Sequence, residues 1–316
     1  MDSLDVRILR TVVSDRSAFP LTWNFRPSFR SIAKLVRADE GTVRNRVRKL
    51  RDSGFLADWH LLVNPRLTGR GDAIAWFDVP AYVSKSELIA ELRLLDGVTV
   101  IGSAYGSFLF VGFRYGRASS RLRQVELIRR LAKTDQVNLG GIRYPETKVR
   151  LAPSDWAVLG AIQKDPRRSY KAVASEVGVT SQTVKRKLTR MMRGNVVFGF
   201  AAYDPKKLHG SVWALLVVSC AVEDWNELDR RLLGKFGEQV WQVTPLAPFN
   251  AGEPMFCGYN LMLADLPSGL EILGVVKQLP VVQNARLELI VEAHALFNPL
   301  EEEVEEHTRG SRAGLN

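Results

Sequence analysis

The sequence has few cysteines and no long apolar segment. Only two of its 316 residues are cysteine, Cys220 and Cys257, and both lie in apolar runs. Two cysteines cannot form a disulfide scaffold or a cysteine-rich zinc site, so we expect a protein of the reducing cytoplasm. No apolar run is long enough to cross a bilayer. The N-terminus, Met1 to Asp5, lacks the charged and then apolar pattern of a signal peptide. We therefore expect no membrane partner.

The residue combinations that mark an enzyme or a cofactor site are also missing. The four histidines, His60, His209, His294 and His307, are scattered, and none has metal-ligand spacing from another ligand residue. The glycines at 69–71 and 140–141 lack the strand–loop–helix context of a phosphate-binding loop. No Gly-x-Ser-x-Gly elbow occurs. We therefore expect no catalytic residues, no metal and no cofactor.

Positive charge is abundant and concentrated in two segments. The chain has 44 lysines and arginines against 34 aspartates and glutamates, a net charge of +10. Residues 1–56 carry twelve basic and six acidic residues, and residues 151–200 carry nine and three, a net +6 in each segment. Residues 201–316 carry a net −7. This clustering indicates a polyanionic partner for the two basic segments.

The two basic segments belong to an arrangement that occurs twice. A basic stretch from Thr42 to Arg51 is followed by Gly54, and one from Thr183 to Met191 is followed by Gly194. Downstream, Asn64-Pro65-Arg66-Leu67-Thr68-Gly69 matches Asp204-Pro205-Lys206-Lys207-Leu208-His209-Gly210. The copies are about 140 residues apart, far more than a solenoid repeat, which indicates a tandem duplication of a pair of domains.

In the first copy, the basic stretch is predicted to be the last of three short helices. Apolar residues recur at helical spacing from Leu4 to Val12 and again from Ser28 to Val36. Asp39 can cap the third helix, whose basic residues then face outward. The buried stripe of this helix is predicted to be Val43, Val47 and Leu50. We interpret Phe55 to Val63 as two short strands that form a β-wing.

The second copy repeats this pattern with a shorter loop between its first two helices. Ser154 is expected to cap the first helix and Thr180 the third. The second helix is expected to end at Gly178, because glycine adopts the left-handed conformation at little cost. The buried positions are predicted to be Trp156, Leu159, Ile162, Val184, Leu188 and Met191. Asn195 to Tyr203 is interpreted as the matching wing.

Each helical segment is followed by elements in the order β-α-β-β-α-β, which is that of a ferredoxin-like domain. In the first copy the strands are predicted at Asp72–Val79, Val98–Gly102, Phe108–Phe113 and Val137–Tyr144, with helices at Lys85–Leu95 and Ser119–Lys133. In the second copy they are predicted at Ser211–Ala221, Val240–Pro245, Phe256–Leu263 and Ala285–Ile290, with helices at Trp225–Lys235 and Ser268–Gln278.

We therefore expect an α+β chain in which two winged helix-turn-helix domains alternate with two ferredoxin-like αβ domains. The helix-turn-helix domains are expected at residues 1–63 and 151–203, and the ferredoxin-like domains at residues 64–150 and 204–298. An acidic tail, residues 299–316, is expected to hold one short helix followed by disorder. A sheet with one apolar face needs a partner, so residues 72–150 are expected to pack on residues 210–297.

This order of a capped basic helix, a wing, an Asn-Pro or Asp-Pro turn and a ferredoxin-like domain resembles the Lrp/AsnC family of feast/famine transcription regulators. The resemblance covers nearly the whole chain, twice. It implies a sequence-specific regulator that binds double-stranded DNA. Typical members carry one copy and dimerise. The resemblance therefore implies an intrachain pseudo-dimer with two half-sites, and it leaves a further homodimer open.

A helix in the major groove contacts base edges with its N-terminal residues, while flanking cations contact phosphates. The candidates for base contacts in the first copy are Thr42, Arg44 and Asn45. In the second copy the candidate set contains Ser181, Gln182, Thr183, Lys185 and Arg186. The cations better placed for phosphates, or for keeping the helix soluble, are Arg37, Arg46, Arg48, Lys49, Lys187, Arg190 and Arg193. Asparagine favours adenine and arginine favours guanine, so the copies are expected to prefer different half-sites, or one copy to add mainly nonspecific binding.

Three further functions are considered for the same sequence: an effector site, a sirohaem decarboxylase and an architectural chromatin protein. Ferredoxin-like domains of this family usually bind amino acids through a Gly-x-Asp-like element, but Gly106-Ser107-Phe108 and Gly258-Tyr259-Asn260 lack the acid. A small-molecule effector therefore stays open, and a turn role for both glycines is favoured. Sirohaem decarboxylases are similar to the same fold, and the loop from Phe19 to Pro27 resembles theirs. An architectural chromatin protein would bind DNA without sequence preference.

Overall fold

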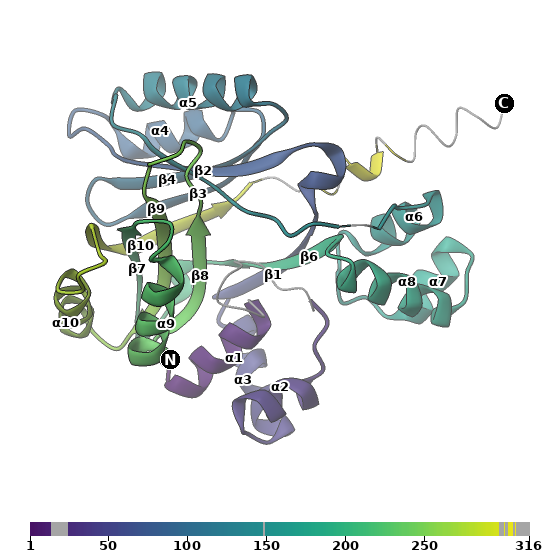
Figure 1. Cartoon of the computed structure of the whole chain (residues 1–316). Helices are drawn as coiled ribbons and strands as arrows, with labels where there is room; N and C mark the ends of the chain where they lie inside the picture. Colours follow the sequence, from purple (N-terminus) through teal and green to yellow (C-terminus); the bar gives the residue numbers. More distant parts are fainter. Residues whose placement is uncertain (14–24, 148, 297–299, 301–302, 306, 308–316) are drawn as a thin grey trace.

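The computed structural model describes residues 1–13, 25–147, 149–296, 300, 303–305 and 307 (Figure 1). These residues form two three-helix units, a two-stranded ribbon and an eight-stranded sheet with four helices on it. The α+β class is confirmed. None of the described helices is both long and apolar enough to span a bilayer. Phe19, Pro20 and Leu21 lie outside the described residues.

The first helical unit consists of α1 (Ser3–Val13), α2 (Phe29–Val36) and α3 (Glu40–Asp52). Asp39 caps α3 as predicted, because its carboxylate accepts a hydrogen bond from the backbone N–H of Thr42 at 2.8 Å. The stripe predicted from helical spacing, Val43, Val47 and Leu50, is buried. It packs mainly on apolar residues of α1 and α2.

The second helical unit consists of α6 (Pro153–Ile162), α7 (Tyr170–Val177) and α8 (Ser181–Arg193). Thr180 caps α8, and α7 ends at Gly178, both as predicted. The expected cap of α6 is wrong. Ala152 occupies the N-cap position instead of Ser154, and the Asp155 carboxylate accepts a hydrogen bond from the Ala152 N–H at 2.9 Å. Pro153 suits the first helical position because its fixed φ is helical and it lacks an N–H.

The prediction that each wing is a pair of strands is wrong. Each segment is a single strand, β1 (Leu56–Val63) or β6 (Val197–Tyr203), and the two pair with each other in antiparallel fashion. Neither contains the Asn-Gly, Asp-Gly or Gly-Gly pair that a tight hairpin needs, so neither folds back on itself. This β1–β6 ribbon connects the helical units. Leu61 and Val63 of β1 accordingly lie in the core of the second unit.

Two ferredoxin-like halves form the rest of the molecule. The first αβ half contains β2 (Gly71–Asp78), α4 (Lys85–Leu92), β3 (Val98–Ala104), β4 (Phe108–Tyr115), α5 (Ala118–Ala132) and β5 (Asn138–Gly141). The second contains β7 (Val212–Cys220), α9 (Trp225–Phe236), β8 (Val240–Leu246), β9 (Met255–Leu263), α10 (Leu266–Lys277) and β10 (Asn284–Ala295). Short 3₁₀ turns, Pro65–Thr68 and Pro205–Lys207, lead into the halves. The predicted elements are found, although β5 is shorter than expected and β10 extends beyond Ile290 to Ala295.

The halves share one sheet, in the order β5-β2-β4-β3-β10-β7-β9-β8. Strand β10 joins the two halves. Its N-terminal part pairs with β7 of its own half, and its C-terminal part pairs with β3 of the first half. At the far edges, Gly141 and Ala247 exchange two backbone hydrogen bonds of 2.8 and 2.9 Å, which brings β5 beside the end of β8. The sheet therefore closes on itself.

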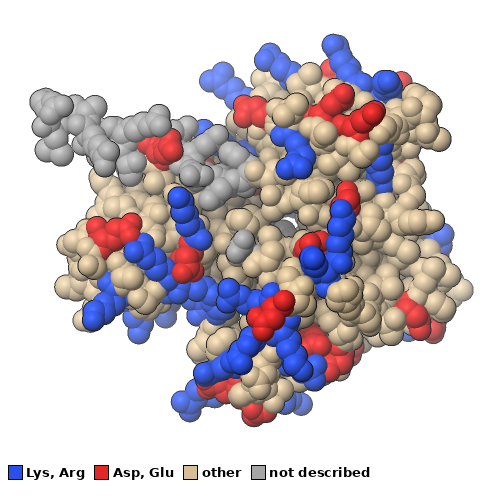
Figure 2. All heavy atoms as spheres, turned by 180° about the vertical axis from the view of Figure 1, so that it is seen from behind, with Lys and Arg blue, Asp and Glu red and all other residues tan. Residues whose placement is uncertain are grey.

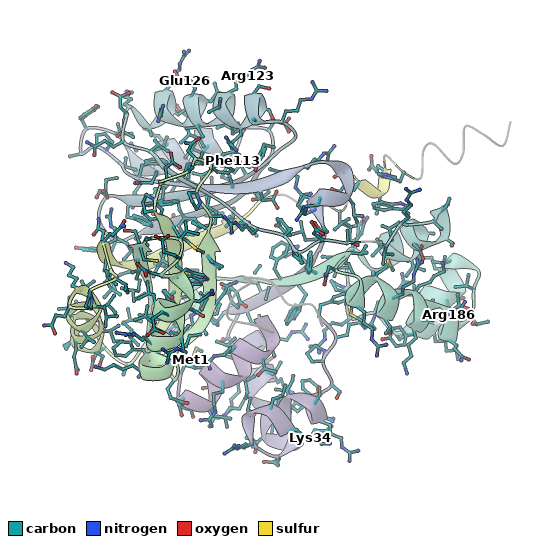
Figure 3. All side chains as sticks on the ribbon, viewed as in Figure 1. Met1, Lys34, Phe113, Arg123, Glu126 and Arg186 are labelled. Atoms are coloured by element: carbon teal, nitrogen blue, oxygen red, sulfur yellow. The ribbon has the colours of Figure 1, made fainter. Side chains whose placement is uncertain are left out.

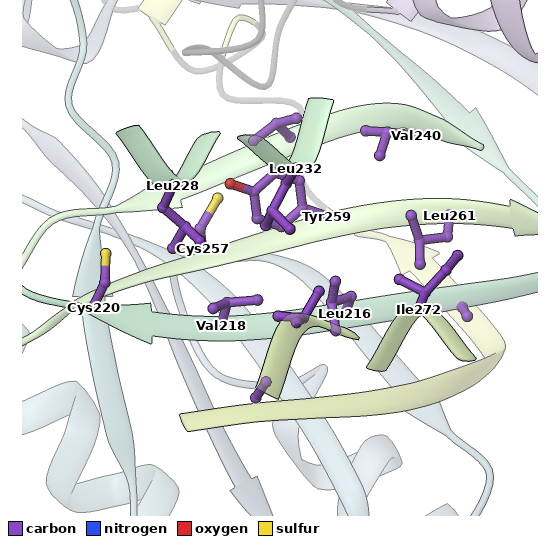
Figure 4. Close-up of a cluster of buried hydrophobic side chains, with 14 of the residues drawn as sticks. Leu216, Val218, Cys220, Leu228, Leu232, Val240, Cys257, Tyr259, Leu261 and Ile272 are labelled. Atoms are coloured by element: carbon purple, nitrogen blue, oxygen red, sulfur yellow. The ribbon is translucent and has the colours of Figure 1, made fainter. Parts of the chain in front are cut away.

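Closure gives every strand an outer and an inner face. Helices α4 and α5 cover the outer face of the first half, and α9 and α10 that of the second (Figure 1). Figure 4 shows the second of these cores, where Leu216, Val218 and Cys220 of β7 lie among side chains of the covering helices. The inner faces meet each other, as in the edge contact of Trp76 with Phe256 at 4.7 Å. The two αβ segments are thus in direct contact, as expected.

The acidic tail is partly buried. Leu300 and Glu303 are fully buried, and residues 303–305 are helical. The Glu303 carboxylate accepts a hydrogen bond from the Arg114 guanidinium at 3.0 Å, and the His307 ring stacks on Trp156 at 4.2 Å. A short helix was expected, but a buried glutamate was not. The end of the tail, residues 308–316, where disorder was expected to follow the helix, lies outside the described residues.

Candidate nucleic-acid interface

The third helix of each unit turns its basic face outward. Arg44, Asn45, Arg48 and Lys49 are exposed on α3. On α8 the exposed candidates are Ser181, Gln182, Lys185, Arg186 and Arg190. Figure 3 shows Arg186 at the outer rim of the second unit. In Figure 2, lysines and arginines gather over both helical units, at the left and the bottom of the view. Most of the predicted contact residues are therefore accessible.

The turn before each third helix has the same backbone geometry. Arg37 has φ 54° and Gly178 has φ 72°, so both lie in the left-handed region. Each is followed by one apolar residue and then the N-cap of the next helix. Glycine tolerates this conformation, whereas an arginine there is strained by about 1 kcal/mol. The strain at Arg37 suggests that its exposed guanidinium has a function at this position.

Arg44 is held in place by its own helix. It forms an ion pair with Glu40 at 2.8 Å, and its guanidinium lies over the Phe29 ring at 5.4 Å from the centroid. The side chain is still half exposed. The threonines at the start of the third helices are more constrained. The Thr42 hydroxyl hydrogen bonds to Asp39, and the Thr183 hydroxyl lies 2.9 Å from that of Thr180.

Some of the predicted contact cations are committed to holding the first helix on the third. Arg46 pairs with Asp2 at 2.8 Å and Asp5 at 3.2 Å, and the nearby Asp5 carboxylate raises the pKa of Arg46. Lys187 of the second copy pairs with Asp155 at 2.8 Å, and Arg190 contacts the same carboxylate. We call these contacts the helix clamps.

The carboxylates of the helix clamps are buried. Asp5 and Asp155 are 7 % and 0 % exposed, and both accept a backbone N–H at the start of their helices. Burial alone would raise the pKa of Asp155, but hydrogen bonds from Lys187, Ala152 N–H and Arg190 hold it below its usual value. The sequence did contain the signal for this pairing, because an aspartate occurs in the first turn of both first helices. An aspartate in the first turn does not by itself identify which basic side chain it meets.

The two helical units also contact each other directly. Phe25, which precedes α2, is fully buried in the core of the second unit. Arg26 donates hydrogen bonds to the backbone carbonyls of Arg167, at 3.2 Å, and Arg168, and it lies over the Tyr170 ring. Arg167 in turn donates to the Pro27 carbonyl at 2.8 Å. The orientation of one basic helix relative to the other is therefore fixed by packing as well as by the β1–β6 ribbon.

Cations are crowded at this contact. Burial, together with Arg26 and Arg51 nearby, lowers the pKa of Arg167. A hollow beside it is lined by Arg44, Arg48 and Arg51 of α3. Asp52 is the one carboxylate that lines the same hollow among the described residues. The positive potential thus extends from the first helical unit toward the second.

The units are attached to the αβ halves in different ways. Helix α1 lies against β8, where Arg10 donates two hydrogen bonds, of 3.0 and 2.7 Å, to the Val240 carbonyl. The second unit instead packs on the tail through Leu300 and Val304. Among the described residues, no group of three or more His, Cys, Asp or Glu side chains is placed to hold a metal ion.

Two basic helix-turn-helix units on a closed pair of ferredoxin-like halves define a tandem helix-turn-helix protein. The AsnC-type helix-turn-helix domain family matches residues 153–192, which span α6 to α8. The regulator Ptr1 of Methanocaldococcus jannaschii is 31% identical over 115 residues, covering 34% of this chain and 67% of Ptr1. LrpA1 of Halobacterium salinarum, also named a transcriptional regulator, is 33% identical over 76 residues, 24% of this chain and 54% of LrpA1. The chain belongs to the Lrp/AsnC family of transcriptional regulators.

Solved structures of one enzyme are similar along nearly the whole chain. One is the siroheme decarboxylase NirDL in complex with an iron-uroporphyrin III analogue, with a TM-score of 0.57. The similarity covers 98% of this chain and 99% of NirDL at 15% sequence identity. At that identity the similarity shows a shared fold.

Proposed function

We propose that this protein is a cytoplasmic, sequence-specific regulator that binds double-stranded DNA, and that one chain contacts two half-sites. The observation that carries the proposal is the pair of equivalent, outward-facing basic helices, α3 and α8, each preceded by the same turn. A helix of this kind fits the major groove, where side chains distinguish base pairs by their hydrogen-bonding pattern.

The side-chain contacts refine the proposed DNA-binding set. Residues proposed to contact bases are Arg44, Asn45, Ser181, Gln182, Lys185 and Arg186. Residues proposed to contact phosphates are Arg37, Arg48 and Lys49. Thr42 and Thr183 are assigned to the start of their helices, because their hydroxyls are engaged there. Arg46, Lys187 and Arg190 are assigned to the helix clamps.

The proposed pseudo-dimer is supported by the way in which the halves join. The second strand of the first half, β3, pairs with the fourth strand of the second half, β10. On the other side, β8, the second strand of the second half, ends at Leu246. The adjacent Ala247 bridges to Gly141, the last residue of β5, which is the fourth strand of the first half. The two joints are therefore equivalent, as in a two-fold dimer. We keep the domain boundaries at residues 63, 150, 203 and 298 as part of the proposal.

The decisive experiment is selection of bound duplexes from a random pool by the full chain, followed by footprinting and a stoichiometry measurement. The expected result is one chain on two half-sites whose centres are about 34 Å apart, or 10–10.5 base pairs. Inserting about five base pairs between them should weaken binding strongly, because the second half-site then faces the opposite side of the duplex. Protection of one half-site per chain would contradict the proposal.

The two alternatives make different predictions. A chromatin protein would recover no preferred sequence in the selection. A sirohaem decarboxylase would change the visible spectrum of added sirohaem, and an unchanged Soret band would remove that alternative. The observation that favours the sirohaem decarboxylase alternative is the fold similarity to NirDL over nearly the full length of the chain.

A further inference from the structure

The closed sheet contains a cavity that its side chains do not fill. The space is about 240 Å³ and lies at the end of the sheet that faces the β1–β6 ribbon. Ile74 and Phe110 of the first αβ half and Trp213 of the second form its walls. Leu62 of β1 and Phe200 of β6 line it on the ribbon side. Both halves and both copies of the ribbon strand therefore contribute to one site.

The cavity continues deeper between the sheets. A second space of about 80 Å³ shares four of its lining residues, Ile74, Phe110, Thr244 and Asn260. Nearby, the same interior is tightly filled by aromatic rings, with Trp213 and Trp241 in edge contact at 5.2 Å. Protein interiors are packed to about 0.75 of their volume and rarely leave voids larger than a water molecule. An opening of this size beside a packed core indicates room for a ligand.

The chemistry of the lining selects a neutral, mainly apolar ligand. No Lys, Arg or His lines the cavity among the described residues. Its one charged residue, Asp72, already accepts hydrogen bonds from Arg114 and from the Tyr144 hydroxyl, at 2.9 and 2.6 Å. A ligand carboxylate would therefore find no free cation in the lining to pair with. This argues against a free amino acid or a carboxylated tetrapyrrole at this place.

A few polar groups remain to orient such a ligand. The Asn260 side chain accepts from Trp213 Nε1 at 2.9 Å and donates to Gln242 at 3.3 Å, so it is fixed. Thr99 and Thr244 also line the cavity, and within the described part of the chain neither hydroxyl has a hydrogen-bond partner. Asn260 belongs to the Gly258-Tyr259-Asn260 element in which the acid expected of an amino-acid site is missing.

We propose that this cavity binds a neutral small molecule of one or two rings with a single hydrogen-bonding group, and that binding changes the DNA affinity through the β1–β6 ribbon. An apolar cavity of about 150 Å³ holds benzene, so the available space suits a substituted or fused ring. The ribbon strands that line the cavity run between α3 and α8. A ligand in contact with Leu62 and Phe200 therefore touches β1 and β6, the strands that set the separation of the two basic helices. The second part of this proposal rests on the proposed DNA-binding function.

The binding part is tested by calorimetry on the full chain with p-cresol and indole, which are neutral, and with 4-hydroxybenzoate, which is anionic. Saturable one-to-one binding is expected for at least one neutral compound and not for the anion. Ala293→Leu, which fills the cavity, should weaken binding at least about tenfold. Thr244→Val, which removes a hydroxyl from the lining, should weaken binding of p-cresol more than that of the parent hydrocarbon toluene. Ala118→Leu, on the exposed start of α5, is the matched control.

The outcomes separate the two parts. If neither neutral compound binds saturably, or if Ala293→Leu and Ala118→Leu bind alike, water fills the cavity and the site is overturned. The coupling part is tested by fluorescence anisotropy of a bound duplex with and without the neutral compound. A change of about fivefold or more in DNA affinity is expected. Ligand binding with unchanged DNA affinity would overturn the coupling alone. If no duplex binds at all, the proposed function fails while the calorimetric result still decides the cavity.

Discussion

At the scale of single residues, the two copies use different side chains on an identical backbone frame. The N-caps Asp39 and Thr180 begin the third helices in the same way. The side chains that follow differ, with Arg44-Asn45 in one copy and Lys185-Arg186 in the other. A frame that is repeated while its exposed residues diverge is what two different half-sites require, because base readout depends on the donor and acceptor pattern of a few side chains.

Replacing Asn45 by alanine is expected to relax sequence preference. The loss should be about 1–3 kcal/mol on the best site and much less on random DNA, because a bidentate contact to one base is removed. Arg48→Ala should weaken binding to both duplexes equally, because a phosphate contact carries no sequence information. Anisotropy titrations on the selected and a scrambled duplex measure both. Equal losses for Asn45→Ala on the two duplexes would show that α3 is oriented differently in the groove.

Replacing Arg37 by glycine is expected to separate stability from DNA binding. The left-handed backbone at Arg37 suits glycine better, so Arg37→Gly should raise the free energy of unfolding by about 0.5–1 kcal/mol. The same change should lower DNA affinity, since a cation is lost beside the basic helix. The reverse substitution in the other copy, Gly178→Arg, should destabilise the fold by a similar amount. Urea unfolding and anisotropy give the two readouts; unchanged DNA affinity in Arg37→Gly would leave the strain without a functional reason.

At the scale of helices and strands, contacts between elements decide which cations are available. The helix clamps tie α1 to α3 and α6 to α8 through buried aspartates. Arg46 lies two positions after the exposed Arg44, and Lys187 lies two positions after the exposed Lys185. Both are paired in the clamps, so they are not among the residues proposed to contact DNA. The same contacts fix the angle at which each third helix leaves its unit. The clamps therefore set the orientation of the basic helices, although their own charges are paired within the protein.

The clamp of the second unit is expected to contribute to stability above acidic pH and to lose that contribution as pH falls. The folded-state pKa of Asp155 lies below its usual value. Its contribution is thus fully present above about pH 4, the usual pKa of aspartate, and disappears as pH falls through the lower folded value. Asp155→Asn keeps an acceptor for the Ala152 N–H but removes the charge. The variant should be less stable at neutral pH and show a flatter acid limb in urea unfolding; parallel pH profiles would contradict this.

At the scale of the whole molecule, the two helical units are equivalent in fold but not in attachment. The first rests on β8 through α1, and the second is held by the tail. Glu303 connects the tail to Arg114, which also binds Asp72 in the first αβ half. The β1–β6 ribbon and Phe25 then join the units to each other. One chain therefore holds the two basic helices, α3 and α8, in a fixed relation.

Glu303→Gln is expected to destabilise the protein by about 1–3 kcal/mol. The substitution removes a charge partner from Arg114, which is itself buried, and a buried charge that loses its partner is costly. Glu271→Gln, on the exposed face of α10, is the matched control and should change stability by less than about 0.5 kcal/mol. Chemical unfolding of both variants decides the point. Equal stability of the two would mean that the tail contact adds nothing to the fold.

Duplex binding is expected to weaken steeply with salt. If the six cations left in the proposed DNA-binding set neutralise about three to six phosphates, log K should fall against log salt concentration with a slope of about −3 to −5, because each neutralised phosphate releases counterions. Arg48→Gln should reduce the slope by about 1, whereas Lys277→Gln, on α10 away from the helical units, should leave it unchanged. A salt-independent binding constant would count against DNA as the partner.

Local sequence patterns determined the elements of this protein. The caps at Asp39 and Thr180, the stop at Gly178 and the order β-α-β-β-α-β were all readable, because capping and periodicity act within a few residues of the chain. The exposed basic faces of α3 and α8 followed from the same periodicity. The duplication and the family resemblance were likewise visible in the order of these short patterns.

Only the tertiary structure decided which distant segments meet. The pairing of β1 with β6 joins residues such as His60 and Phe200, and the clamps join Asp5 to Arg46 and Asp155 to Lys187. The burial of Glu303 depends on Arg114, which lies far away along the chain. Strand pairing and ion pairing of this kind are set by how whole units pack, and a strand or a carboxylate has many partners of suitable chemistry. Local patterns specify that a partner is needed, and packing selects which one is within reach.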